Sequence, residues 1–351
     1  MCGEMQTMPF GAVGGVLAWW RCAMAQRAIM RRLFEAIIFY YVDDTHVIDV
    51  EPGSGEAVAA FQEVMSLLGW ALDTKKRQPS SSCVQSLGCQ LSVHSNGVSW
   101  ALDSEKRETW LGDIRRHLAS GVMQPGEAAK LYGRLAFGGQ RVFGRVGRAA
   151  LRPLARQQRG RSTHIARRLS SALTWWEAFL SQCPVQHLKW ERRLLGAPDM
   201  VLYTDAEQKG RVGVALIDNA CGRGWYVASR VPRRWRRALI PRKTQINLYE
   251  LLAVTLAVRT FANELRGKRI VAFIDNTCAL NMVIRGASRK DDANGILHHL
   301  WLELAMLGVH AEWQCVPSKL NVADGPSREC FTDVLALGLS CRMAQWGTRL
   351  L

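Results

Sequence analysis

Four acidic residues in the C-terminal half of the chain have the types and spacing of divalent metal ligands. They are Asp205, Glu250, Asp275 and Asp324. Asp205 and Asp275 end apolar runs that predict strands, whereas Glu250 and Asp324 lie near the starts of predicted helices. Strand ends and helix starts meet in one crevice of an open sheet, and Mg²⁺ and Mn²⁺ prefer carboxylate oxygens. The pattern predicts a site for two ions, one activating water and one stabilising a leaving oxygen.

Each of these acids also has a purely structural alternative. Glu250 follows Asn247 by three residues, as the acid of a helix capping box does. Asp275 and Asn276 form a pair that can cap the following helix. Asp324 lies in a segment whose composition is typical of turns. The residues alone leave these alternatives open.

A second pair of acids, Asp43 and Asp44, directly follows the apolar run 37–42. Because the β-prone run 46–50 comes next, the stretch predicts a strand, a tight turn and a returning strand, with both carboxylates at the tip. Adjacent carboxylates repel each other, and a bound divalent cation would offset that repulsion. The structural alternative is an acidic hairpin turn in solvent.

Strands and helices alternate around the four C-terminal acids. Predicted strands cover 200–205, 212–217, 225–228, 269–275 and 309–316, and predicted helices cover 246–265, 277–285 and 291–307. The segment from 321 is expected to be a helix or a loop. Earlier helices are predicted at 18–36, 57–68, 104–119 and 127–137, and a hairpin joins 87–93 to 98–102. These assignments rest on apolar residues three or four apart in helices, and on Asn96-Gly97 for the hairpin turn. The fold class is therefore α+β combined with α/β.

The chain is strongly basic, with a formal net charge of +16 over 351 residues. Such an excess favours polyanion partners, and nucleic acid is the first candidate. Between Ala128 and Trp176 there is no Asp or Glu, and arginines recur three or four residues apart. They are Arg141, Arg145, Arg148, Arg152, Arg156 and Arg159. We expect them to share one helical face that contacts a phosphate backbone, although Pro153 can kink or split that helix.

A second basic cluster contains Arg233, Arg234 and Trp235. Basic residues beside an exposed aromatic ring can grip a phosphate backbone and stack on a sugar or base. A solvated charged surface is the structural alternative for both clusters. Trp175 and Trp176 are instead predicted to be core residues, because they lie at helical spacing with other large apolar residues.

The ten cysteines are scattered, and none forms a CxxC pair. They predict reduced thiols of an intracellular protein rather than a zinc ribbon. The pattern predicts no signal peptide, no transmembrane segment and no membrane partner. The choice between cytoplasm and nucleus stays open, as does the oligomeric state.

The stretch Tyr41-Val42-Asp43-Asp44 resembles the YxDD box of reverse transcriptases. The segment 8–12, MPFGA, resembles the segment that precedes this box, and 68–70, Lys75 and 87–91 resemble later palm motifs. Because these motifs follow in family order, the chain resembles the Pol protein of retrotransposons of the long-terminal-repeat or DIRS type. The resemblance implies an RNA-directed DNA polymerase palm with Asp43 and Asp44 as metal ligands. It also implies a nucleotide pocket lined by Pro9, Phe10, Gly11 and Tyr41.

The phrases around the four C-terminal acids resemble the RNase H domain of the same proteins. They are YTDA at 203–206, INLYELLA at 246–253, FIDN at 273–276 and NVADGPSR at 321–328. The resemblance implies cleavage of the RNA strand of an RNA–DNA hybrid, leaving 3′-hydroxyl and 5′-phosphate ends, with two Mg²⁺ or Mn²⁺ ions. One departure is the loop 315–320, which lacks the His that many cellular RNases H carry, so turnover is expected to be slower or Lys319 to contribute a charge.

The resemblance predicts four parts of the chain. They are a truncated polymerase palm at 1–102 without fingers or first palm strand, a basic helical thumb or connection at 103–195, an RNase H-like mixed-sheet domain at 196–330, and an unassigned tail at 331–351. We expect no DNA synthesis from this chain alone, because the first palm carboxylate is missing. The expected function is a ribonuclease acting on RNA–DNA hybrids, with RNA and DNA backbones as partners. The alternatives are an inactive nucleic-acid-binding relic, and a polymerase that needs a missing N-terminal part.

Overall fold

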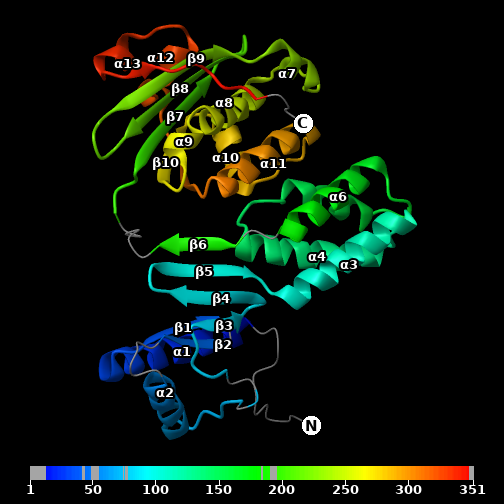
Figure 1. Ribbon diagram of the computed structural model, residues 1–351, viewed down its shortest axis with the longest axis vertical. Coiled ribbons are helices and arrows are strands. Elements are labelled where there is room, and N and C mark those ends of the chain that lie inside the picture. Colours follow the sequence, from blue (N-terminus) through cyan, green and yellow to red (C-terminus); the bar gives the residue numbers. More distant parts are fainter. Residues whose placement is uncertain are drawn as a thin grey trace. The chain divides into compact units, whose positions relative to one another are not determined.

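The computed structural model describes residues 13–41, 44–48, 55–73, 75, 78–182, 185–189 and 196–347. The chain divides into two compact units, Met1–Val84 and Gln85–Leu351. Each is an assembly of helices and strands, so the predicted mixed fold class is confirmed (Figure 1). The unit boundary precedes the predicted one at 102, because the hairpin that follows it packs with the helical segment.

In its described residues, the smaller unit shows two α-helices and a pair of antiparallel strands. Its elements are α1 (Val13–Phe34), β1 (Ile37–Tyr41), β2 (Asp44–Ile48) and α2 (Glu56–Leu67). Strands β1 and β2 pair antiparallel with Tyr41 opposite Asp44, which confirms the two predicted strands and places Asp44 within β2; residues 42–43 lie outside the described residues. A small core holds the unit together, and it includes Met30, Ile38 and Met65.

A sheet of four strands in the order β3-β4-β5-β6 follows, and its first strand spans the boundary between Val84 and Gln85. The strands are β3 (Cys83–Ser86), β4 (Cys89–His94), β5 (Gly97–Leu102) and β6 (Gln186–Lys189). The β4–β5 hairpin is the one predicted around Asn96-Gly97, since His94 pairs with Gly97. Strand β6 was not predicted; it pairs with β5 from about 90 residues further along the chain.

A helical segment follows the β5 strand. It consists of α3 (Ser104–Ser120), α4 (Pro125–Val142), η2 (Ala149–Leu151), α5 (Arg152–Gln157) and α6 (Arg167–Gln182). Asp103 caps α3 by accepting from the Lys106 N–H at 3.0 Å, and Gln124 and Glu127 form a capping box on α4. Trp176 is 1% exposed in the core of this segment, which confirms its predicted core role.

The predicted arginine face does not lie on one helix, and that expectation is wrong. Helix α4 ends at Val142, and Gly144 and Gly147 then adopt φ of 62° and 76°, in the left-handed region that favours glycine. A Cβ on Gly147 would lie 2.4 Å from the Trp176 ring, so the chain turns where only glycine fits. Helix α5 restarts at Arg152 with Pro153 in its first turn, where proline is tolerated.

The C-terminal domain is built on a mixed sheet in the order β11-β10-β7-β8-β9-β12. Its strands are β7 (Met200–Ala206), β8 (Arg211–Asp218), β9 (Gly224–Arg230), β10 (Arg269–Ile274), β11 (His310–Cys315) and β12 (Ser340–Cys341). Strands β7 to β9 form an antiparallel meander, and β10 and β11 add parallel strands beyond β7. The predicted alternation of strands and helices is confirmed.

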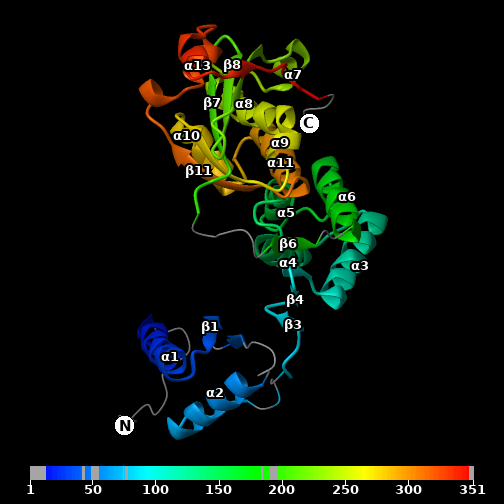
Figure 2. The same cartoon turned by 60° about the vertical axis from the view of Figure 1, so that its left-hand side comes forward.

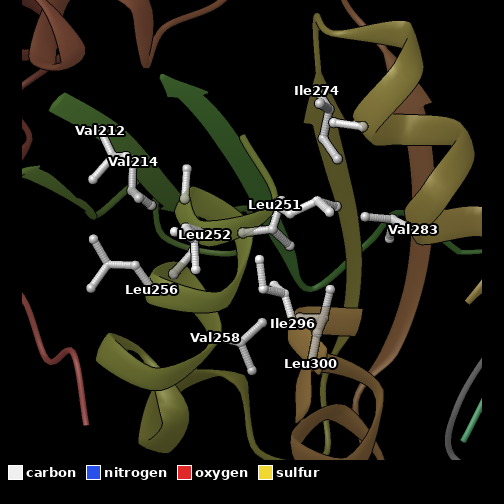
Figure 3. Packing of buried hydrophobic residues seen from close by; sticks show 14 of the residues in the cluster. Val212, Val214, Leu251, Leu252, Leu256, Val258, Ile274, Val283, Ile296 and Leu300 are labelled. Atoms are coloured by element: carbon white, nitrogen blue, oxygen red, sulfur yellow. The ribbon is translucent and has the colours of Figure 1, made fainter. Parts of the chain in front are cut away.

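Helices cover both faces of this sheet (Figures 1 and 2). They are α7 (Arg233–Ala238), α8 (Ile246–Thr260), α9 (Ala262–Leu265), α10 (Thr277–Arg285), α11 (Asp291–Met306), η3 (Ser318–Leu320), α12 (Asp324–Ser327) and α13 (Thr332–Ala336). Helix α8 carries the main core: Leu251, Leu252 and Leu256 pack with Val214 of β8 and Ile296 of α11 (Figure 3). On the opposite face, Val334 and Leu339 pack against Ala215 and Tyr226.

The segment 331–347, predicted as an unassigned tail, belongs to this domain. Strand β12 pairs parallel with β9, and the Trp346 ring meets the Trp235 ring edge-on with centroids 5.1 Å apart. The Trp346 indole N–H also donates to Ser229 Oγ at 3.0 Å. None of the described helices is long and apolar enough to cross a membrane.

Candidate metal centre

Three of the four predicted acids converge at one edge of the C-terminal sheet. One carboxylate oxygen from each of Asp205, Glu250 and Asp275 can be chosen so that all lie within 4.8 Å of one another. Strands β7 and β10 are parallel neighbours with Thr204 paired to Ile274, so the next residues, Asp205 near the end of β7 and Asp275 just after β10, lie side by side. Helix α8 packs against β7 and supplies Glu250 from the side.

The structure excludes the capping-box role for Glu250 and assigns the capping of α10 to Asn276. Helix α8 begins at Ile246 with Gln245 as its N-cap, so Glu250 is not the third residue of a capping box. Asn276, rather than Asp275, caps α10 by accepting from the Ala279 N–H at 2.9 Å. The Asp275 carboxylate is therefore left to face the other two acids.

Burial and mutual repulsion change the protonation of the two most enclosed acids. Asp205 is 4% exposed and Glu250 is 2% exposed. Desolvation by burial, reinforced by the nearby charges of Asp205 and Asp275, raises the pKa of Glu250 from 4.5 to about 9. Burial also raises the pKa of Asp205 to about 6, and the charges of Asp275 and Asp324 add to that rise, whereas a hydrogen bond from Ser327 opposes it.

These residues fit a divalent cation. Glu250 Oε1 accepts from the Ala206 N–H at 3.3 Å, but Glu250 Oε2 is buried and has no hydrogen-bond partner among the described residues. A buried carboxylate oxygen without a partner is costly. A cation among the three carboxylates would satisfy that oxygen and remove the repulsion that keeps Glu250 protonated.

The fourth acid, Asp324, begins helix α12 and lies outside the set of three. Its Oδ1 is 2.7 Å from Arg328 Nη2, and its side chain is 30% exposed. Its charge still reaches the site, because it contributes to the raised pKa of Asp205. Of the four predicted acids, three therefore cluster, and the fourth, Asp324, lies nearby on α12.

Two serines contact the clustered acids and were not predicted as site residues. Ser327 Oγ donates to Asp205 Oδ2, and Ser318 Oγ donates to Asp275 Oδ2 at 2.8 Å. Ser327 lies within the NVADGPSR phrase, so the motif contained a signal for it. Nothing in the local sequence distinguishes Ser318.

The predicted palm residues are described only in part. Pro9, Phe10, Gly11 and Asp43 lie outside the described residues. Asp44 begins β2 and is exposed, and Tyr41 ends β1 and is 44% exposed. The palm metal site and nucleotide pocket therefore stay predictions.

Several arginines of the first basic cluster bind the C-terminal domain instead of facing solvent freely. Arg152 donates to the Ser288 carbonyl from Nε at 2.8 Å and from Nη2 at 2.6 Å, and Arg148 Nη1 donates to the Arg285 carbonyl at 3.2 Å. Arg156 Nη2 lies 2.9 Å from Asp291 Oδ1.

The remaining members of that cluster differ in their surroundings. Arg145 is half-buried beside Gly286, and the side chain of Arg141 lies outside the described residues. Arg159 is exposed, so its phosphate contact stays a prediction.

In the second basic cluster, the aromatic residue is not exposed as predicted. Trp235 is 2% exposed and packs in the main core, where the Arg259 guanidinium lies 5.3 Å from its ring centroid. The expectation failed because residues that pack against the ring, such as Trp346 with its edge-on contact, lie far away in the sequence. Arg233 and Arg234 are exposed on α7, and Arg234 Nη2 donates to the Gly347 carbonyl at 2.6 Å.

Comparisons with known proteins give little beyond this geometry. No family model matches the chain, and no curated protein matches it. One similar solved structure is the foamy viral protease-reverse transcriptase in complex with RNA/DNA hybrid. The similarity has a TM-score of 0.44 and 15% sequence identity, and it covers 88% of this chain and 39% of that chain. It is too distant to bear on the site.

Proposed function

We propose that the C-terminal domain is a metal-dependent nuclease that cleaves the RNA strand of RNA–DNA hybrids. The observation that carries the proposal is the buried cluster of Asp205, Glu250 and Asp275, with one Glu250 oxygen lacking a partner. Buried like charges destabilise a fold, so their convergence from three separate elements points to a function. The resemblance of all four acid-bearing phrases to the RNase H domain supports the choice of substrate.

In this proposal Asp205, Glu250 and Asp275 hold Mg²⁺ or Mn²⁺, and Asp324 is the further ligand of a two-ion site. When bound, the ions activate water and stabilise the charge on the leaving 3′ oxygen. The protein itself orients the carboxylates and excludes water from the inner oxygens. Full ionisation of Glu250 is coupled to metal binding, because only the deprotonated carboxylate is a ligand.

Helix α7 offers a surface for the phosphate backbone of the substrate. Its buried Trp235 anchors the helix, while Arg233, Arg234, Arg236 and Arg237 are exposed around it. The Arg236 side chain and the Tyr249 ring both lie close to Gly210 in the β7–β8 turn. The exposed arginines of α7 supply positive charge that can neutralise phosphates.

Cleavage of a labelled RNA–DNA hybrid by the whole chain tests the proposal. We expect Mg²⁺ or Mn²⁺ to support cleavage of the RNA strand alone, leaving 3′-hydroxyl and 5′-phosphate ends. Asp275→Asn should abolish cleavage and keep hybrid binding, whereas Asp333→Asn, on an exposed acid of α13, should cleave like wild type. Equal cleavage by wild type and Asp275→Asn would contradict the proposal.

The second candidate is a nucleic-acid-binding protein without catalysis, favoured by the net charge of +16. Tight, salt-sensitive hybrid binding without cleavage in either metal would establish it. DNA synthesis by the palm stays a weaker proposal, since it is supported only by the resemblance of the Tyr41-Val42-Asp43-Asp44 stretch and its neighbouring motifs. Synthesis on a primed template by this chain together with a separate fingers fragment would support it.

A further inference from the structure

The segment 315–327 places one serine hydroxyl on each of the two acids that end neighbouring strands. Ser327 Oγ contacts Asp205 Oδ2 and lies 2.9 Å from the Asp324 carbonyl oxygen. Ser318 Oγ lies 2.8 Å from Asp275 Oδ2. Ser327 is 0% exposed, whereas Ser318 is exposed on η3. A hydroxyl carries one proton, and the charged carboxylate accepts it in preference to the neutral carbonyl.

The serine hydroxyls can fix the χ2 torsion of the two aspartates, which packing restrains only weakly. The χ2 torsion of aspartate joins an sp³ carbon to an sp² carbon and has a broad, roughly two-fold energy profile. The plane of the carboxylate is therefore set by hydrogen bonds rather than by rotamer preference. With Oδ2 of Asp205 engaged by Ser327, the direction of Oδ1 is also determined.

Close backbone contact holds Ser327 in place. Gly213 of β8 pairs with Asp205, and a Cβ on Gly213 would lie 2.2 Å from the Ala323 carbonyl and 2.5 Å from the Ser327 nitrogen. Helix α12 thus rests directly on the strand backbone beside Asp205. Asn321 adds a further attachment, because its Nδ2 donates to the Thr204 carbonyl at 3.0 Å.

We propose that Ser327 and Ser318 are positioning residues that hold the Asp205 and Asp275 carboxylates in their metal-binding orientation. Ser327 also joins the strand bearing Asp205 to the helix bearing Asp324, so the two acids are placed as a pair. The proposal rests on the metal site of the proposed function. Hydrogen-bond partners of metal ligands typically contribute 10- to 100-fold to metal affinity or activity.

Mn²⁺ binding to the whole chain, measured by calorimetry and by the Mn²⁺-induced rise in Tm, tests this proposal without requiring cleavage. Mn²⁺ binding that persists in Asp275→Asn is subtracted as binding outside the acid cluster. We expect Ser327→Ala to raise the Mn²⁺ midpoint by roughly 10-fold or more. Ser318→Ala should raise it in the same direction by less, because its hydroxyl is exposed. If Ser327→Ala does not fold, Ser318→Ala decides the test alone.

The matched control is Thr255→Val, which removes another buried hydroxyl. Thr255 is 1% exposed and donates to the Leu251 carbonyl at 2.9 Å within α8, not to an acid. It should lower Tm and leave the Mn²⁺ midpoint unchanged. The same midpoint in wild type and both serine variants would overturn the inference, as would the absence of Mn²⁺ binding by wild type. Mn²⁺ binding without hybrid cleavage would remove the proposed function and leave the inference standing.

Discussion

Replacing Glu250 by Gln is expected to make the metal-free protein more stable while removing its metal site. The substitution keeps an oxygen that can accept from the Ala206 N–H, now 3.3 Å from Glu250 Oε1. It removes the group whose pKa burial and the charges of Asp205 and Asp275 raise to about 9. A folded state that holds a proton which the unfolded state has released loses stability as pH rises. The wild type should therefore weaken from about pH 4.5 upward, and the Gln variant should lack that contribution.

The magnitude follows from the size of the pKa shift. Each pKa unit corresponds to about 1.4 kcal/mol. Near pH 7 the unfolded Glu250 is ionised and the folded one is protonated. Because pH 7 lies about 2.5 units above the ordinary pKa of 4.5, holding this proton costs roughly 3 kcal/mol of unfolding free energy. Near pH 5.5 the same cost is roughly 1.4 kcal/mol. The advantage of Glu250→Gln should thus grow by about 2 kcal/mol across this range.

Urea unfolding in a chelator, followed by circular dichroism at several pH values, measures this difference. The control is Glu177→Gln, which makes the same replacement at an acid that is paired with Arg115 at 2.8 Å, away from the clustered acids. Adding Mn²⁺ should stabilise wild type and leave Glu250→Gln unchanged. A Gln variant whose advantage does not increase with pH would refute the conclusion that burial and charge repulsion keep Glu250 protonated.

Three further substitutions test other parts of the structure. Gly213→Ala places a Cβ 2.2 Å from the Ala323 carbonyl oxygen, so it should displace α12. The free energy of unfolding, measured by denaturation, should fall by about 1–3 kcal/mol, and calorimetry should show weaker Mn²⁺ binding. Trp235→Ala empties a core position and should cost about 3–5 kcal/mol in urea unfolding, a loss that an exposed stacking residue would not show. Asp291→Ala removes the partner of Arg156; because the pair is half-exposed, stability should fall by at most about 1 kcal/mol, with salt-sensitive hybrid binding becoming tighter.

Local patterns were sufficient to predict most elements of the larger unit. An apolar run that ends in an acid identifies both a strand and the side chain at its end, which is why the sequence alone singles out Asp205 and Asp275. Helix α8 could be predicted, although it breaks at Phe261 rather than continuing to Leu265. In these cases the information lies within a few neighbouring residues.

The arginines show where local patterns fail. Arg156 and Asp291 are 135 residues apart, and no spacing rule relates them. The predicted helical face also depended on a continuous helix, which Gly144 and Gly147 interrupt. Basic charge in the sequence therefore predicted an affinity for anions, but not whether the anion is a phosphate or a carboxylate of the same chain.

Residue patterns alone predicted most of the strands and helices, the excess of basic charge and the identity of the candidate acids, although β6, α7 and β12 escaped them. Long-range packing was needed to bring carboxylate oxygens of Asp205, Glu250 and Asp275 within 4.8 Å of one another, with Asp324 outside that set. The same holds for the contact of Ser327 with Asp205 and for that of Trp346 with Trp235. The physical reason is that periodicity and turn chemistry act between near neighbours. Burial, hydrogen bonding and charge repulsion at the site instead depend on strand order and helix packing, which bring distant residues together.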